Sequence, residues 1–242
     1  MVPNGKGTLC VVATPLGNLK DITLRALEVL KGSDLIAAED TRRTQKLLSA
    51  YDLHVPLISF NENNQYRKIP FLIERLKQGQ QVSLVTDGGT PGISDPGREL
   101  VRETRQARIT VVPIPGPSAL ICALSVSGLP GDSFIFLGFL PRRKSRRKRI
   151  LQEMKEQKRT VIFYEAPHRI RDLLKEIEAV LGEREVTLTR ELTKIHEEII
   201  SGPVSELLRQ LADREPKGEY TLLLAPEEKE SSEFGSQAFV YP

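Results

Sequence analysis

Largely apolar runs of strand length alternate with amphipathic stretches along the first half of the chain. Residues 8–13 (TLCVVA), 34–39 (DLIAAE), 57–60, 82–85 and 109–114 resemble buried strands, and residues 22–30, 41–50, 69–77, 98–106 and 118–126 have helical spacing. Strands without a polar face must be covered on both sides, which is typical of a parallel sheet between two layers of helices. The pattern predicts an α/β domain with a mostly parallel sheet. Asp21 is the expected cap of the first helix and Gly32 its end.

A second α/β domain is predicted after the turn-rich segment 128–132 (GLPGD). Here the expected strands are residues 134–139, 160–165, 186–189, a strand near residue 199 and 220–225, with a helix over residues 204–211. This half favours a mixed sheet. The predicted domains are therefore residues 1–128 and residues 129–226, followed by a flexible tail over residues 227–242.

Composition excludes several classes of protein. The net charge is only +3, so a nucleic-acid-binding surface has to be local. The two cysteines, Cys10 and Cys122, lie in separate apolar runs, and the three histidines are scattered, so no metal site is predicted. No signal peptide is recognisable and no apolar run reaches the ~18 residues of a membrane span, which favours a cytoplasmic protein without membrane contact.

Three loops rich in glycine and proline follow three of the predicted parallel strands. We call residues 14–18 (TPLGN) the first loop, residues 87–97 (DGGTPGISDPG) the second loop and residues 113–118 (PIPGPS) the third loop. Ligands of open α/β sheets bind beyond the carboxyl ends of the strands, so the loops predict a small-molecule pocket there. They lack the motifs of a phosphate-binding loop or a dinucleotide site, and proline donates no N–H to phosphate. S-adenosylmethionine is one candidate among several.

Residues 142–149 (RRKSRRKR), which we call the basic run, contain seven cations in eight positions. Such a run is often only a solvated face, but one this dense in a nearly neutral chain favours a polyanion, through contacts with the phosphate backbone. Arg42, Arg43 and Arg169 are expected to extend this surface. The phosphate-binding candidates in the run are Arg142, Arg143, Lys144, Arg146, Arg147, Lys148 and Arg149.

Several segments together resemble one family of enzymes. They are residues 12–48 (VATPLGNLKDITLRALEVLKGSDLIAAEDTRRTQKLL), 84–97 (LVTDGGTPGISDPG), 113–120 (PIPGPSAL), 138–142 (GFLPR) and 163–170 (FYEAPHRI). In order and content they resemble the ribosomal RNA small subunit methyltransferase I family of the tetrapyrrole methylase superfamily. The chain departs from the family at Gly89, where alanine is common, and it lacks the longer C-terminal helical segment of many members.

The resemblance implies two α/β domains with S-adenosylmethionine in the cleft between them, and a homodimer. It implies 2′-O-methylation of a cytidine in the decoding region of 16S rRNA in the small ribosomal subunit. By the same resemblance the cofactor contacts are Leu16, Thr90, Ile93, Ser94, Ser118, Ala119, Tyr164 and Thr221. The alternative roles are loop capping for Thr90 and Ser94 and core packing for Leu16 and Ile93.

A 2′-hydroxyl is a weak nucleophile, so a carboxylate near the strand ends is expected to accept its proton or position it. The candidates are Asp40, Asp87 and Glu165, with Glu39, Asp95 and His168 as alternatives. Glu39 and Asp40 could instead cap a helix, and Glu165 could be bound to Arg169 as part of the structure. Two rival functions are also open: methylation of a small tetrapyrrole, and RNA binding without catalysis.

Overall fold

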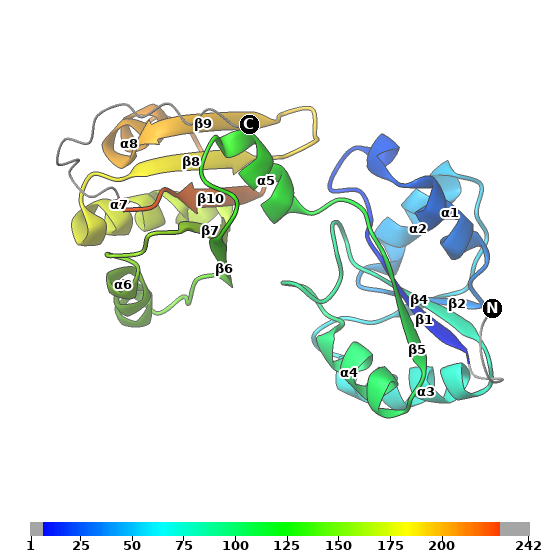
Figure 1. The fold of residues 1–242 in the computed structure, drawn as a ribbon. Coiled ribbons are helices and arrows are strands. Elements are labelled where there is room, and N and C mark those ends of the chain that lie inside the picture. Colours follow the sequence, from blue (N-terminus) through cyan, green and yellow to red (C-terminus); the bar gives the residue numbers. More distant parts are fainter. Residues whose placement is uncertain (1–6, 228–242) are drawn as a thin grey trace, which may run out of the picture. The chain divides into compact units, whose positions relative to one another are not determined.

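The structure is a computed structural model that describes residues 7–227. Its contacts divide the chain into two compact units (Figure 1). Unit 1 contains the described residues up to Ala123 together with Arg190–Glu198, and unit 2 contains Leu124–Thr189 and the residues from Ile199 onward. The division falls within helix α5 (Ala119–Ser127), close to the predicted boundary at residue 128. The predicted tail over residues 227–242 lies almost wholly outside the described residues.

Unit 1 is built on a parallel sheet of five strands in the order β3-β2-β4-β1-β5. The strands are β1 (Thr8–Val12), β2 (Leu35–Ala38), β3 (Leu57–Ser59), β4 (Gln81–Val85) and β5 (Thr110–Ile114). Each pair of neighbouring strands is parallel, for example β1 with β4, where Cys10 lies opposite Ser83. The predicted parallel sheet is confirmed, and all its strands end at the same edge.

Helices cover both faces of this sheet (Figure 1). The elements are η1 (Leu19–Asp21), α1 (Leu24–Lys31), α2 (Thr41–Ala50), α3 (Gln65–Lys77) and α4 (Arg98–Gln106). On one face, Leu72 of α3 and Leu100 of α4 pack in a buried cluster with Leu84 of β4. On the other face, Leu30 of α1 and Leu48 of α2 pack in a second cluster with strands β1, β2 and β4. Burial on both faces explains why the strand sequences carry no polar side.

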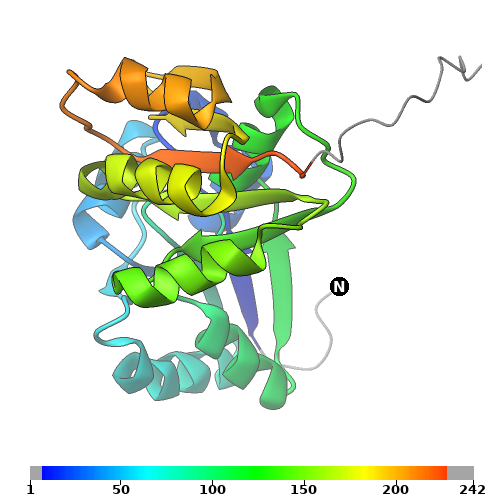
Figure 2. The same ribbon diagram turned by 90° about the vertical axis from the view of Figure 1, so that its left-hand side faces the viewer.

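Unit 2 has a mixed sheet in the order β6-β7-β10-β8-β9. Its elements are β6 (Phe134–Phe139), α6 (Lys144–Glu153), β7 (Thr160–Glu165), η2 (Pro167–Arg169), α7 (Ile170–Leu181), β8 (Glu185–Arg190), β9 (Glu198–Pro203), α8 (Val204–Leu211) and β10 (Tyr220–Leu224). Strand β6 runs parallel to β7, whereas β10 runs antiparallel to it, as the predicted mixed sheet requires. Helices α6, α7 and α8 bury one face of the sheet in a single apolar cluster, and Figure 2 shows α7 and α8 side by side in yellow-green and orange.

Two helix starts differ from the predictions. Thr23, and not Asp21, caps α1, because its side chain accepts the N–H of Ala26 while Asp21 lies in the preceding turn η1. Helix α3 begins at Gln65, before the predicted start at residue 69, and contains Pro70 in its second turn. Proline has no N–H for the helical hydrogen-bond ladder, so a helix that contains one beyond its first turn is hard to place from the sequence. None of the helices within residues 7–227 is both long and apolar enough to span a membrane.

Candidate active site

The three loops are hydrogen-bonded to one another at the carboxyl edge of the parallel sheet. Thr14 of the first loop donates its N–H to the Gly89 carbonyl (3.0 Å) and accepts the Gly89 N–H in return (2.9 Å). The Thr90 hydroxyl then donates to the Pro117 carbonyl of the third loop at 3.1 Å. The prediction that these segments meet is therefore confirmed, and the second loop joins the other two.

Glycine permits the close approach of the first two loops. A Cβ on Gly88 would lie 3.1 Å from the carbonyl oxygen of Pro15, tighter than ordinary contact. Gly89 has a φ of +88°, a left-handed conformation that costs L-residues free energy, and its Cβ would meet the Leu16 side chain at 3.4 Å.

The predicted cofactor residues of unit 1 lie along this edge. Leu16, Thr90, Ser94, Ser118 and Ala119 are half-buried, and Ile93 is 55% exposed. Ile93 is thus not a core residue, so that alternative is wrong for it. The Thr90 hydroxyl does hold the loops together, as the capping alternative required, although its oxygen can still accept a hydrogen bond. The edge therefore offers apolar surface beside backbone polar groups, a lining that suits a ligand with few phosphates.

In unit 2 the structure brings Tyr164 and Thr221 together. They are directly opposed in the antiparallel pair of β7 and β10, so they lie on the same face of the sheet. The Tyr164 ring packs edge-on against Phe136, with ring centroids 4.9 Å apart, and tilted against Phe139 at 5.7 Å. These rings belong to the face opposite the helices, because the helical side buries Phe163 and Leu222 instead.

Three carboxylates interlock at the ends of β2 and β4. The Asp40 N–H donates to Asp87 Oδ1 at 3.0 Å, and the Asp87 N–H donates to Glu39 Oε2 at 3.2 Å. Asp40 also caps α2, accepting the N–H of Arg42 at 2.8 Å and its guanidinium at 2.7 Å. This hydrogen bonding from Arg42 holds the pKa of Asp40 well below its usual range, which makes it a poor proton acceptor.

Glu39 and Glu165 have surroundings that differ from those of Asp40. Burial raises the pKa of Glu39, the backbone N–H of Asp87 lowers it, and the nearby charges of Asp95 and Asp87 raise it further. Glu165 in unit 2 is 2% exposed, and its Oε1 atom accepts the Ala166 N–H at 2.9 Å and pairs with Arg169 at 3.2 Å. Burial also raises the pKa of Glu165. The Glu165 carboxylate is enclosed and paired with Arg169. This fits the alternative that Glu165 stabilises the structure better than it fits contact with a substrate.

A cavity of about 230 Å³ opens between the first loop, α2 and the end of β4. Its lining residues are Thr14, Pro15, Leu16, Gly17, Leu19, Arg43, Thr44, Lys46, Leu47, Thr86 and Asp87. Asp87 has a partly exposed side chain, and its Oδ2 atom lies 3.5 Å from Arg43 Nη1. Asp87 therefore lines a cavity beside the first loop, together with Arg43 and Lys46, two cations that could bind an anionic group.

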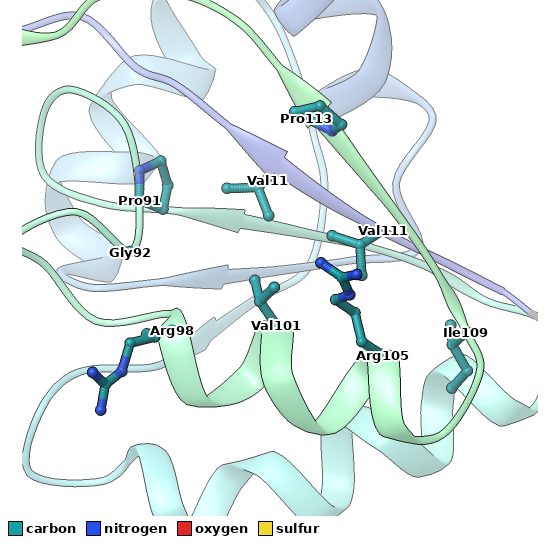
Figure 3. Close-up of a pocket in the computed structure, with 9 residues that line it drawn as sticks. All are labelled: Val11, Pro91, Gly92, Arg98, Val101, Arg105, Ile109, Val111 and Pro113. Carbon is teal, nitrogen blue, oxygen red and sulfur yellow. The ribbon is translucent and has the colours of Figure 1, made fainter.

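A second cavity, of about 760 Å³, lies on the other face of the parallel sheet, between α4 and the edge strand β5 (Figure 3). Val11, Val101 and Val111 point into it, while Arg98 points outward from the start of α4 (Figure 3). Pro91 and Gly92 of the second loop and Pro113 of the third loop complete its wall. Pro91 and Gly92 of the second loop thus line this cavity, whereas Asp87, at the start of the same loop, lines the first-loop cavity. Within residues 7–227 no group of three His, Cys, Asp or Glu side chains is placed to hold a metal ion.

The structure divides the basic run into two kinds of residue. Arg142, Arg143, Lys144, Arg146, Lys148 and Arg149 are exposed. Arg147 is 4% exposed and pairs with Glu176 of α7, with Nη2–Oε1 at 2.6 Å. Arg169 is also largely enclosed, since it donates to the Leu140 carbonyl at 2.8 Å and pairs with Glu165. The prediction that Arg147 and Arg169 bind phosphate is therefore corrected, because each side chain is enclosed in unit 2 and its charge is paired with a carboxylate there. Arg42 and Arg43 are exposed.

Two contributions to the site escaped sequence reasoning. Arg190–Glu198, which connects β8 to β9, packs with unit 1, and Thr193 Oγ1 accepts the Asn18 N–H at 3.2 Å. A Cβ on Gly17 would meet the Lys194 side chain, so glycine lets this side chain lie close against the first loop. Lys46 of α2 lines the first-loop cavity. The helical spacing of Arg43 and Lys46 could have predicted that Lys46 lies beside the loops. No local feature of the sequence predicts the contact of Thr193 with the first loop.

Comparison with known proteins places these features in context. Residues 8–208 match the family of tetrapyrrole (corrin/porphyrin) methylases. The chain is 48% identical over 222 residues to the ribosomal RNA small subunit methyltransferase I of Thermotoga maritima, an alignment that covers 92% of this chain and 100% of that relative. It is 50% identical over 226 residues to the protein of the same name from Vibrio cholerae, covering 92% of this chain and 78% of that one.

Two solved structures share the fold at low sequence identity. A cobalamin biosynthetic enzyme, cobalt precorrin-4 methyltransferase, aligns with a TM-score of 0.68 and 17% identity, covering 93% of this chain and 98% of its own. Uroporphyrin-III-C-methyltransferase from Thermus thermophilus aligns with a TM-score of 0.60 and 21% identity, covering 91% and 94%. At these identities the similarity concerns the fold alone.

Proposed function

Because this chain belongs to the ribosomal RNA small subunit methyltransferase I family of the tetrapyrrole methylases, we propose that it methylates a cytidine of 16S rRNA. The acceptor is the ribose 2′-hydroxyl of a cytidine in the decoding region, and the methyl donor is S-adenosylmethionine. The observation that carries this proposal is the 48% identity along the whole length of the Thermotoga maritima relative. A ribosomal substrate implies a cytoplasmic enzyme, and we propose a homodimer, which sedimentation of the purified protein tests.

The residues at the carboxyl edge of unit 1 fit the cofactor. When bound, S-adenosylmethionine supplies a methyl group on a positively charged sulfur, which makes it reactive toward oxygen. The loops present apolar surface at Leu16 and Ile93, and their prolines make them poor phosphate sites. Glu39 and Asp87 place negative charge at the same edge, which favours a cationic ligand. Thr90, Ser94, Ser118 and Ala119 of unit 1, and Tyr164 and Thr221 of unit 2, are the further proposed contacts.

Asp87 is the carboxylate that we assign to the acceptor hydroxyl. When the bound cofactor supplies its methyl group to the oxygen, the Asp87 carboxylate would accept the proton that the hydroxyl releases. The backbone N–H of Asp40 and the guanidinium of Arg43 fix the orientation of that carboxylate. Arg43 and Lys46, which line the same cavity, supply positive charge for the adjacent phosphate. Most of the rate enhancement then comes from positioning of the hydroxyl.

The assay is methyl transfer from tritiated S-adenosylmethionine to small ribosomal subunits that lack the modification, followed by nucleoside analysis. We expect label in 2′-O-methylcytidine. Label in another nucleoside would refute the cytidine assignment, and label in a porphyrinoid but not in rRNA would identify a small-molecule methylase. Failure to bind the cofactor in calorimetry would leave an RNA-binding protein without catalysis.

Asp87→Asn tests the assignment of the carboxylate. We expect transfer at saturating cofactor to slow by roughly 100-fold, the lower range of general acid–base effects, because the amide cannot accept the proton. Asp34→Asn is the matched control, because Asp34 also accepts a backbone N–H, from Gln81 at 2.7 Å, but at the opposite edge of the sheet. Equal rates for the two variants would show that Asp87 takes no proton.

A further inference from the structure

Unit 2 contains a cavity of about 400 Å³ beside the start of the basic run. Its lining residues are Phe139, Leu140, Pro141, Arg142, Ala166, His168 and Arg169. The size falls in the range of small-molecule sites, and the lining combines an aromatic ring with cationic and polar side chains. Strand β6 and the turn after it form one side of this cavity, and the turn η2 forms the other.

Two enclosed arginines fix the wall of the cavity. Arg169 donates to the carbonyl oxygens of Leu140 (2.8 Å) and Pro141 (3.4 Å), and Arg147 Nη1 donates to Pro141 at 3.3 Å. Each arginine is neutralised by a carboxylate, Arg169 by Glu165 and Arg147 by Glu176. The guanidinium groups of Arg147 and Arg169 therefore anchor the turn over residues 140–141 through charge-assisted hydrogen bonds, and the cavity is preformed.

Phe139 is the unusual member of the lining. It is 57% exposed, although one side of its ring packs against Tyr164 with centroids 5.7 Å apart. The part of the Phe139 ring that lies in water beside the cavity is available to a ligand, which would gain the free energy of burying it. Arg142 lies in the same lining, and the exposed cations of the basic run follow it directly.

We propose that this cavity binds one unstacked nucleotide of single-stranded RNA, with its base on the Phe139 ring and its phosphate at Arg142. Sequence-tolerant recognition of single strands combines aromatic platforms with a cationic path for the backbone, and both are present here. The exposed His168 adds a second aromatic ring with hydrogen-bonding nitrogens at the rim. The subsite rests on the proposed function, because it assigns to the RNA substrate a nucleotide other than the methylated one.

The chain contains no tryptophan, so Phe139→Trp places a single fluorescent reporter in the cavity. The probe is a ten-residue oligocytidylate, with inorganic polyphosphate as a ligand that has the charge but no bases. The matched control is Phe71→Trp, at a 42% exposed phenylalanine on α3 of unit 1. We expect the oligonucleotide to quench the introduced tryptophan at position 139 but not the one at position 71. Polyphosphate should compete for binding without causing that quenching.

Binding of the same fluorescently labelled oligonucleotide to Phe139→Ala and Phe139→Leu gives an independent measurement by anisotropy. Removing the ring on which one base stacks should raise the Kd roughly 5- to 100-fold in both variants, whereas Phe139→Tyr should bind like the wild type. Leucine keeps the apolar packing against Tyr164, so a weakened Phe139→Leu variant points to stacking. Unchanged affinity of the alanine variant, or equal quenching at positions 71 and 139, would overturn the proposal.

Methyl transfer to small subunits by the wild type keeps the two proposals apart. If the subunits are not methylated but the oligonucleotide quenches the reporter, the proposed function fails and the subsite stands. If the subunits are methylated while stacking on Phe139 is absent, the subsite fails alone.

Discussion

Arg147→Met separates the structural role of this residue from the phosphate binding predicted for its neighbours. Arg147 is enclosed, it forms two bonds to Glu176, and it donates a third to the Pro141 carbonyl. Removing one partner of a buried ion pair costs about 3–5 kcal/mol. The Glu176 side chain is 21% exposed, so its carboxylate can partly rehydrate. We expect the free energy of unfolding to fall by about 2–3 kcal/mol, with methionine keeping the packing of the arginine stem.

The measurement is urea denaturation followed by far-ultraviolet circular dichroism, combined with oligonucleotide affinity as a function of salt. Lys148→Met is the matched control, because Lys148 is the exposed neighbour on the same helix and should change stability by less than about 0.5 kcal/mol. Arg147→Met should lower the urea midpoint and leave the log–log salt slope of RNA binding unchanged at temperatures where it is folded. A normal midpoint together with a flatter salt slope would refute the structural assignment.

Three further predictions concern charge. Changing Arg146, Lys148 and Arg149 to glutamine should reduce the log–log salt slope of RNA binding by about 0.7 for every phosphate that the variant no longer neutralises, with cofactor affinity unchanged in calorimetry. Glu165 has a raised pKa, so its contribution to stability is present below its unfolded pKa and disappears as pH rises through the folded value. The stability of Glu165→Gln relative to the wild type, from urea midpoints, should therefore rise with pH above about 4.5. Glu39 also has a raised pKa, so cofactor affinity should increase with pH over the same range in the wild type and less in Glu39→Gln.

The fold could be predicted from the sequence where the pattern is local. Strands β1, β2 and β4 have no polar side, and this alone required cover on both faces of a parallel sheet. Cap residues were harder to choose, because Asp21 and Thr23 are both suitable and only the chain path decides which side chain reaches Ala26. The packing of Arg190–Glu198 with unit 1 joins distant segments of the chain, and no periodicity in the sequence encodes it.

The site was predictable to the level of loops but not of individual atoms. Glycine and proline identified the three loops, because backbone approach and fixed turns require those residues. The roles of Asp40 and Glu165 depended on partners in space, since Arg42 engages the first and Arg169 the second. The burial of Arg147 could have been predicted from helical spacing, because it lies on the same helix face as Ile150, Leu151 and Met154, which pack on the core of unit 2. The many cations around Arg147 made the whole segment look exposed.

The distribution of charge explains how one chain of net charge +3 can serve two ligands of opposite sign. The interlocked carboxylates of Glu39, Asp40 and Asp87 hold negative charge at the carboxyl edge of unit 1, where a sulfonium would be favoured. The exposed cations of α6 lie in unit 2, which suits phosphates. Net charge conceals this separation because it sums all 35 Lys and Arg and all 32 Asp and Glu residues of the chain. A substitution that neutralises one group should therefore weaken one ligand and spare the other, whereas a nonspecific ionic effect would change both affinities together.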